Sequence, residues 1–246
     1  MTGEASYTLQ DFPLQASIQA VKASTDFQSY EDFYHYMLDH LPQNSPQTRR
    51  RYANLVGKRY FPGLSLNSLL PQVWKAYQDE QILVDLMRVM ALEAEPVIAR
   101  FVLDEVWPLA VGQVFDMQVA CTFIEDTYSV FKKQSYKRLL LTVRYLGFLG
   151  RYSSELVVEE IPTPADALLI LLHDRLAPTP RIVRLSEILA TTWWRFLGLK
   201  TADAVRHILR DAEAAGLISR YTTVDELEQV TTRFTRDDYI AQARRL

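Results

Sequence analysis

Two stretches of this chain share one pattern, and that pattern limits the folds that the chain can adopt. Residues 145–154 are YLGFLGRYSS and residues 214–223 are AAGLISRYTT, and each closes a segment with helical spacing of apolar residues. In both, a glycine is placed to end the helix, and an apolar stretch then leads through Arg-Tyr and two hydroxyl residues into a β-prone run. This order is typical of the third helix of a winged helix-turn-helix as it passes into its β-hairpin wing. We therefore predict two such units and binding of duplex nucleic acid.

The sequence around the two motifs predicts the other elements that such units need. Before the first motif, apolar residues continue in helical register from Gln113 to Tyr128, and Ser135 is placed to cap the basic helix that follows. Residues 153–161 favour a wing strand. For the second unit the pattern predicts helices over 165–175, 186–197 and 202–215, a hairpin of strands 217–222 and 228–235, and a last short helix over 236–245.

The first 110 residues show helical periodicity and no clear strand. Ser45 is a good N-cap and Pro46 a good first helical residue, so a helix should run from there to about Tyr60. The predicted fold class is mainly α, with small β-hairpins. We divide the chain into a helical domain (1–110), a first helix-turn-helix-like unit with a wing (111–163) and a second winged-helix-like unit (164–246).

Composition excludes several classes of protein. The 246 residues are 48% hydrophobic and 23% charged, which is typical of a globular chain with an ample core. The single cysteine, Cys121, cannot form an internal disulfide and fits a reducing compartment. No apolar run approaches the roughly 18–20 residues needed to span a bilayer. We therefore expect a cytoplasmic protein without membrane contact.

The charges are segregated along the chain. The formal net charge is −3, yet residues 45–60 and 127–151 contain several Lys and Arg and no acidic residue. A single run of this kind is usually a solvated helix face, but two acid-free runs, one of them on a predicted third helix, favour phosphate binding. The predicted DNA-binding residues are Arg49, Arg50, Arg51, Lys132, Lys133, Lys137, Arg138, Arg144, Arg151, Arg206, Arg210, Arg220 and Arg233.

The second unit is the weaker candidate for DNA contact. Its third helix also carries Asp203, Asp211 and Glu213. Winged-helix folds also serve as protein–protein modules, so the fold alone does not fix the function. The pair Trp193-Trp194 could stack on bases, although its apolar neighbours favour a place in the core for at least one of them.

The sequence shows no convincing catalytic constellation. It contains no Gly-rich phosphate loop, dinucleotide fingerprint or nucleophile elbow. Residues 129–132 match Ser-x-x-Lys, but a four-residue match is common by chance. The four histidines lack metal-site spacing with Cys121 or with one another. We predict a non-enzymatic protein without metal or other cofactor.

The segment around the first basic run resembles a known family. Residues 44–51, NSPQTRRR, and the continuation to Arg59-Tyr60 are similar to the S-x-x-T-x-[KR]-R stretch near the start of BrxA proteins, accessory components of bacteriophage-exclusion (BREX) defence systems. Residues 101–106, FVLDEV, and the basic helix that ends in residues 146–149, LGFL, also look like that family. The resemblance covers about 30–220. It implies a largely helical, DNA-binding, non-enzymatic protein that acts beside a methyltransferase and other defence components.

Two other functions remain open at this point. A protein–protein adaptor would use the acidic remainder of the chain and exposed aromatic residues, Tyr30, Phe33, Tyr34 and Tyr36, as a docking surface. A sequence-specific transcription regulator would normally bind a palindrome as a symmetric dimer. Neither the DNA sequence preference nor the oligomeric state follows from the sequence.

Overall fold

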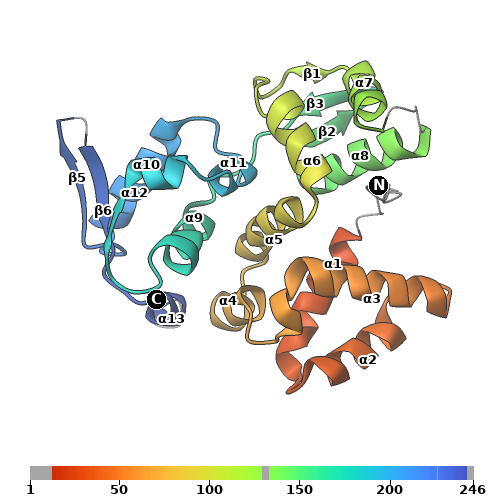
Figure 1. Ribbon diagram of the computed structural model, residues 1–246, viewed down its shortest axis with the longest axis horizontal. Helices are drawn as coiled ribbons and strands as arrows, with labels where there is room; N and C mark the ends of the chain where they lie inside the picture. Colours follow the sequence, from red (N-terminus) through yellow and green to blue (C-terminus); the bar gives the residue numbers. More distant parts are fainter. Residues whose placement is uncertain (1–12, 129–132, 226, 243–246) are drawn as a thin grey trace, which may run out of the picture. The chain divides into compact units, whose positions relative to one another are not determined.

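The computed structural model describes residues 13–128, 133–225 and 227–242 (Figure 1). Within them the chain is mainly helical and contains two small three-stranded antiparallel sheets, which confirms the predicted fold class at this level. Contacts group the chain into two compact units, Met1–Leu14 with Glu95–Ile161, and Gln15–Ala94 with Pro162–Leu246. The division into domains 1–110, 111–163 and 164–246 stays a prediction, and these contacts join its first and last parts.

The N-terminal part of the chain is helical up to Ala94. Its elements are α1 (Leu14–Ala23), η1 (Ser24–Asp26), α2 (Tyr30–His40), α3 (Pro46–Tyr60), η2 (Pro62–Leu64), α4 (Leu69–Tyr77) and α5 (Glu80–Ala94). The predicted start of α3 is confirmed, because the Ser45 hydroxyl accepts a hydrogen bond from the Thr48 backbone N–H at 3.1 Å and Pro46 is the first helical residue.

Helix α5 joins the N-terminal helices to the C-terminal part of the chain in one core. Leu83, Leu86, Val89 and Leu92 are fully buried. The helix contacts α3 and α4 on the N-terminal side and α9 (Ala165–Leu171) and α11 (Trp193–Phe196) on the C-terminal side. Residues 15–94 and 162–246 are therefore stabilised by the same buried apolar surface.

Residues 96–158 contain the first sheet. Their elements are α6 (Pro96–Phe101), η3 (Val102–Val106), β1 (Val114–Phe115), α7 (Met117–Tyr128), α8 (Lys133–Tyr145), β2 (Leu149–Tyr152) and β3 (Glu155–Val158). The sheet order is β1-β3-β2. Under it, the rings of Phe115 and Phe123 pack edge-on against Phe101, with centroids 5.9 and 5.0 Å away.

Residues 165–242 contain the second sheet. Besides α9 and α11, their elements are η4 (Leu172–Leu176), β4 (Ile182–Arg184), α10 (Leu185–Leu189), α12 (Ala202–Ala214), β5 (Arg220–Val224), β6 (Leu227–Thr231) and α13 (Arg236–Gln242). The sheet order is β4-β6-β5. Thr201 caps α12, because its hydroxyl accepts a hydrogen bond from the Ala204 N–H at 3.2 Å.

The two sheet-containing segments have the same order of elements. Each begins with a helix that ends in a π-helical turn, and continues with a short strand, one or two helices, a long helix and a hairpin. In each, the short strand pairs with the second strand of the hairpin. Gly147 (φ 81°) and Gly216 (φ 72°) take the left-handed conformation just after the long helices, as the repeated motif predicts.

Several predicted boundaries are wrong. The helix expected from Gln113 begins at Met117, because residues 114–115 pair with β3 instead. Ser135 does not cap α8; it lies inside the helix and is buried. The helix expected over 186–197 is interrupted and forms α10 and α11.

The second hairpin also differs from its prediction. Strands β5 and β6 are displaced from the predicted ranges, and the pattern did not predict β4, which adds a third strand beside β6. None of the helices in the described ranges is long and apolar enough to cross a bilayer.

Candidate nucleic-acid interface

Helix α8 turns a basic and partly apolar face to solvent. Its inward residues Leu139, Val143 and Leu146 are at most 2% exposed. At about 100° of rotation per residue, the opposite face carries Gln134, Lys137, Arg138, Leu141, Arg144 and Tyr145. Residues 127–154 contain no acidic side chain, so no carboxylate of this stretch neutralises the cations of the outward face.

The hairpin after α8 adds a further cation and an exposed aromatic ring. The Arg151 Nε donates a hydrogen bond to the Ser153 carbonyl at 3.2 Å, and the Tyr152 side chain is exposed. The Tyr152 hydroxyl donates to a Glu159 carboxylate oxygen at 3.4 Å, and this hydrogen bond raises the pKa of Tyr152. Gly150 leaves room for that carboxylate, because a Cβ there would lie 1.6 Å from the Glu159 Oε1. The Glu159 carboxylate therefore lies beside Gly150 and Tyr152 of β2.

Helix α12 of the second segment holds its Arg206 side chain in ion pairs within the fold. The Arg206 Nε contacts both carboxylate oxygens of Glu228 at 2.9 and 3.0 Å, and its Nη1 donates to Asp203 at 2.8 Å. Tyr221 also donates to Glu228, at 3.0 Å. The Arg206 guanidinium lowers the pKa of Glu228, and the hydrogen bonds that Arg206 donates to Glu228 and Asp203 raise the pKa of Arg206. The positive charge of Arg206 is thus neutralised within the fold.

Aligning Gly147 with Gly216 shows how the two faces differ. Gln134, Lys137 and Arg144 of α8 correspond to Asp203, Arg206 and Glu213 of α12. Two of these three positions are acidic in α12, and the third holds the arginine that is already paired. The Arg210 guanidinium, which corresponds to Leu141, lies 5.7 Å from the centre of the Tyr221 ring. The face of α12 is therefore mixed in charge, whereas the face of α8 is basic.

The arginine cluster at 49–51 lies on α3, in the other compact unit from α8. The Arg49 Nη1 donates to the Asp39 carbonyl at 3.3 Å, in the last turn of α2, so this side chain supports the fold. Arg50 is exposed, and the Arg51 guanidinium lies 5.3 Å from the centre of the Tyr52 ring. The three arginines therefore lie on one turn of α3, but Arg49 contacts the end of α2 whereas Arg50 is exposed to solvent.

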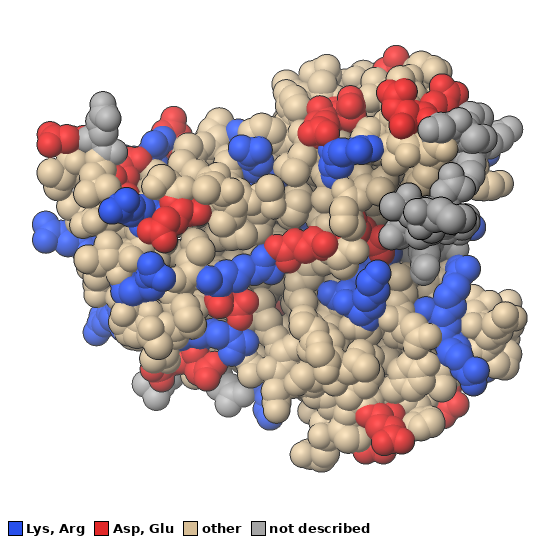
Figure 2. Space-filling view, in the orientation of Figure 1, with Lys and Arg blue, Asp and Glu red and all other residues tan. Residues whose placement is uncertain are grey.

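The remaining predicted contact residues are dispersed. Arg220 is exposed on β5, and the Arg233 guanidinium lies 5.2 Å from the centre of the Phe234 ring. Lys133 is the first residue of α8, and Lys132 lies outside the described residues. On the face shown in Figure 2, basic and acidic side chains are interspersed. Charge on that face therefore does not by itself define an interface.

The residues considered for other chemistry belong mostly to the core. Trp193 and Trp194 are both buried, so neither offers a free ring for base stacking. The buried His173 ring stacks on Tyr239 at 4.1 Å, and burial lowers the pKa of His173. Burial raises the pKa of the Cys121 thiol, which disfavours the reactive thiolate. Among the described residues, no three His, Cys, Asp or Glu side chains are placed to hold a metal ion.

The aromatic surface predicted near α2 is only partly exposed. Phe33 is fully buried and packs on Phe61, with centroids 5.0 Å apart, so its predicted exposure is wrong. Tyr30, Tyr34 and Tyr36 are half-buried. This patch is mainly the outer edge of the core between α2 and α3.

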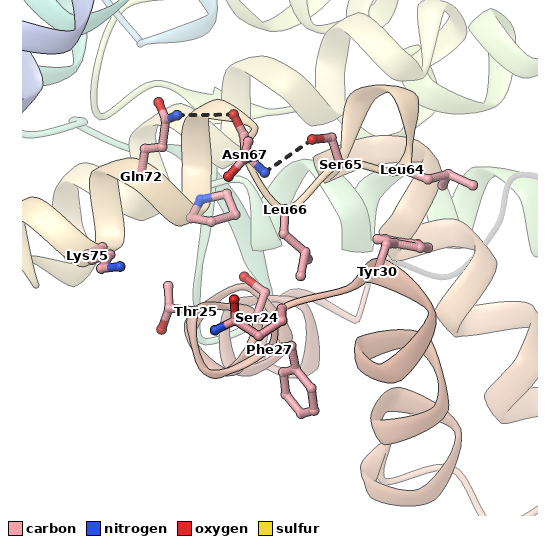
Figure 3. A pocket seen from close by; sticks show the side chains of 12 residues that line it. Ser24, Thr25, Phe27, Tyr30, Leu64, Ser65, Leu66, Asn67, Gln72 and Lys75 are labelled. Carbon is pink, nitrogen blue, oxygen red and sulfur yellow. Dashed lines mark hydrogen bonds between the residues drawn. The ribbon is translucent and has the colours of Figure 1, made fainter.

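Sequence reasoning missed a cavity of about 560 Å³ between η1, η2 and α4 (Figure 3). Its wall includes Lys75 and the Tyr30 ring, and burial raises the pKa of Tyr30 to about 12. Hydroxyl and amide groups come from Ser24, Thr25, Gln28, Ser65, Asn67 and Gln72, and apolar side chains from Phe27, Leu64, Leu66 and Pro71 complete the wall. The Gln72 Nε2 donates to the Asn67 carbonyl at 3.1 Å within that wall. The cavity offers hydrogen-bonding groups and one cation. The sequence did not predict it, because the lining residues come from segments that are separated along the chain.

Comparison with protein families, curated proteins and solved structures finds no match for this chain.

Proposed function

We propose that this chain is a non-enzymatic protein that binds double-stranded DNA with weak sequence preference, through α8 and the β2–β3 hairpin. We interpret both sheet-containing segments as winged helix-turn-helix units, since each has an early strand paired to a hairpin, a long helix directly before that hairpin, and a glycine just after the long helix. In such a unit the third helix enters the major groove and the wing contacts the backbone.

The basic outward face of α8 is the observation that carries this proposal. Lys137 is exposed, Arg138 and Arg144 are half-buried beside it, and the face holds no carboxylate from residues 127–154. Lysine and arginine placed in this way neutralise phosphates and release counterions, which supplies most of the non-specific affinity for DNA. The second unit contributes less, because Glu228 and Asp203 already neutralise Arg206.

The biological setting we propose is phage defence. It rests on the resemblance of residues 44–60 and of the basic helix to BrxA proteins. In that setting the protein acts in the cytoplasm, beside a methyltransferase or related defence components. Its cavity and its second winged unit are then available for contacts other than DNA.

A charge-reversal variant tests the DNA-binding surface. At 0.1 M salt, one lost phosphate contact should weaken binding by about eightfold, so Lys137→Glu/Arg138→Glu should weaken binding of a 30-mer duplex by more than about 60-fold. Arg210→Glu/Arg220→Glu is the matched control, because it makes the same charge change on the corresponding surface of the second unit. Circular dichroism should show that both variants fold. Equal losses of affinity in the two variants would contradict the assignment to α8.

A protein–protein adaptor is the second candidate function. The paired charges of Arg206, Glu228 and Asp203 favour it for the second unit, since a neutralised third-helix face does not attract phosphates. If the full chain binds no duplex at low salt, this second function replaces the first.

A further inference from the structure

The side chain of Leu141 occupies the centre of the outward face of α8. It is 38% exposed and lies one turn after Lys137 and one turn before Tyr145. Arg144 lies at one side of this position and Arg138 at the other. Single exposed apolar residues are common on protein surfaces. This one, however, lies at the centre of the face that a third helix turns toward the base edges of the major groove.

The second unit has a different residue at the position of Leu141. In the second unit the corresponding residue is Arg210, so a cation can be placed at this point of the fold. Helix α8 has a leucine there, although it is basic on both sides. Leucine has no hydrogen-bonding group, so it can contact DNA favourably only where the DNA is apolar.

The major groove offers one such group on unmodified bases. Every base edge there presents donors or acceptors, and thymine adds its C5-methyl group. Cytosine methylated at C5 presents the same methyl group at an equivalent place. We propose that Leu141 is a specificity-determining residue that contacts a pyrimidine 5-methyl group. The proposal rests on the DNA-binding function proposed above.

Duplexes that differ only in methyl groups test this contact. The affinity of the full chain for a random-sequence 30-mer is compared with that for the same pool carrying uracil in place of thymine, and for the pool carrying 5-methylcytosine in place of cytosine. Burying one methyl group is worth about 0.8 kcal/mol, which converts to about fourfold in affinity. If thymine is the target, uracil should weaken binding by about this factor. If methylcytosine is the target, its pool should bind more tightly by about this factor.

The variant Leu141→Ala assigns any difference to this side chain. It should bind all three pools equally and keep the salt dependence of the native protein, because the phosphate contacts remain. The proposal is overturned if the native chain does not distinguish the pools, or if Leu141→Ala distinguishes them as well as the native chain does. Either result would leave the proposed DNA binding intact, as long as the native chain binds with a steep salt dependence. Loss of all binding at low salt would instead refute the DNA-binding function itself.

Discussion

Replacing Asp85 by alanine should destabilise the unit built on α5 severely. Asp85 and Arg88 form an ion pair with both side chains 4% exposed and 2.8 Å between Oδ1 and Nη1, and Gln81 donates to the same oxygen at 3.1 Å. Burial raises the pKa of Asp85 and lowers that of Arg88, so desolvation opposes the pair even though the two charges attract. Removing one partner leaves the other charge in the core, which lowers the free energy of unfolding by about 3–5 kcal/mol.

A double variant separates the buried charge from the packing. Asp85→Leu/Arg88→Met fills the space with apolar side chains, and its free energy of unfolding should equal or exceed that of the native protein by up to about 4 kcal/mol. Glu80→Ala on the same helix is the control, since Glu80 is 48% exposed and should change the free energy by less than about 1 kcal/mol.

Urea unfolding followed by far-ultraviolet circular dichroism measures all three variants. A decrease in the free energy of unfolding below about 1 kcal/mol for Asp85→Ala would refute the reasoning, because it would mean that water or another group readily hydrogen-bonds the buried Arg88 guanidinium in place of Asp85.

Two further predictions concern aromatic residues of the core. Burial lowers the pKa of His173, so the His173 imidazole binds a proton more tightly in the unfolded chain than in the folded one. The free energy of unfolding is therefore highest above about pH 6.5 and decreases as the pH falls below that value. His173→Phe, which keeps the stack on Tyr239, should flatten the pH dependence of urea unfolding between about pH 7 and 5, and an unchanged slope would count against this cause. Trp193→Ala should lower the free energy of unfolding by about 3–5 kcal/mol and leave the salt dependence of DNA binding unchanged. Weakened DNA binding with unchanged stability would instead support base stacking.

The sequence predicted the helices and the repeated third-helix motif because these depend on local rules. Periodicity predicted α12, the cap at Ser45 forms as expected, and Gly147 and Gly216 take the left-handed conformation just after α8 and α12. Strands β1 and β4 escaped prediction because each has only two or three residues and is defined by pairing with a distant strand. A helical pattern continuing through Val114 could not reveal that pairing.

The candidate site was predicted as a set of cations, but not in its distribution. The sequence shows that α12 carries acidic residues, but the ion pair between Glu228 and Arg206 depends on how the β5–β6 hairpin packs on α12. The hydrogen bond from Arg49 to the Asp39 carbonyl likewise depends on how α3 packs against α2. Helical spacing places Leu141 on the face opposite the apolar residues, and its 38% exposure agrees with that, but spacing alone does not indicate what an exposed leucine contacts.

Binding of the native chain to a random-sequence 30-mer duplex should be measured over a range of salt concentrations. Contacts by Lys137, Arg138, Arg144 and Arg151 with phosphates predict that log K falls linearly with log salt, with a slope of about −3 to −4. No binding at about 50 mM salt, or binding that does not change with salt, would contradict phosphate contact through α8 and its wing.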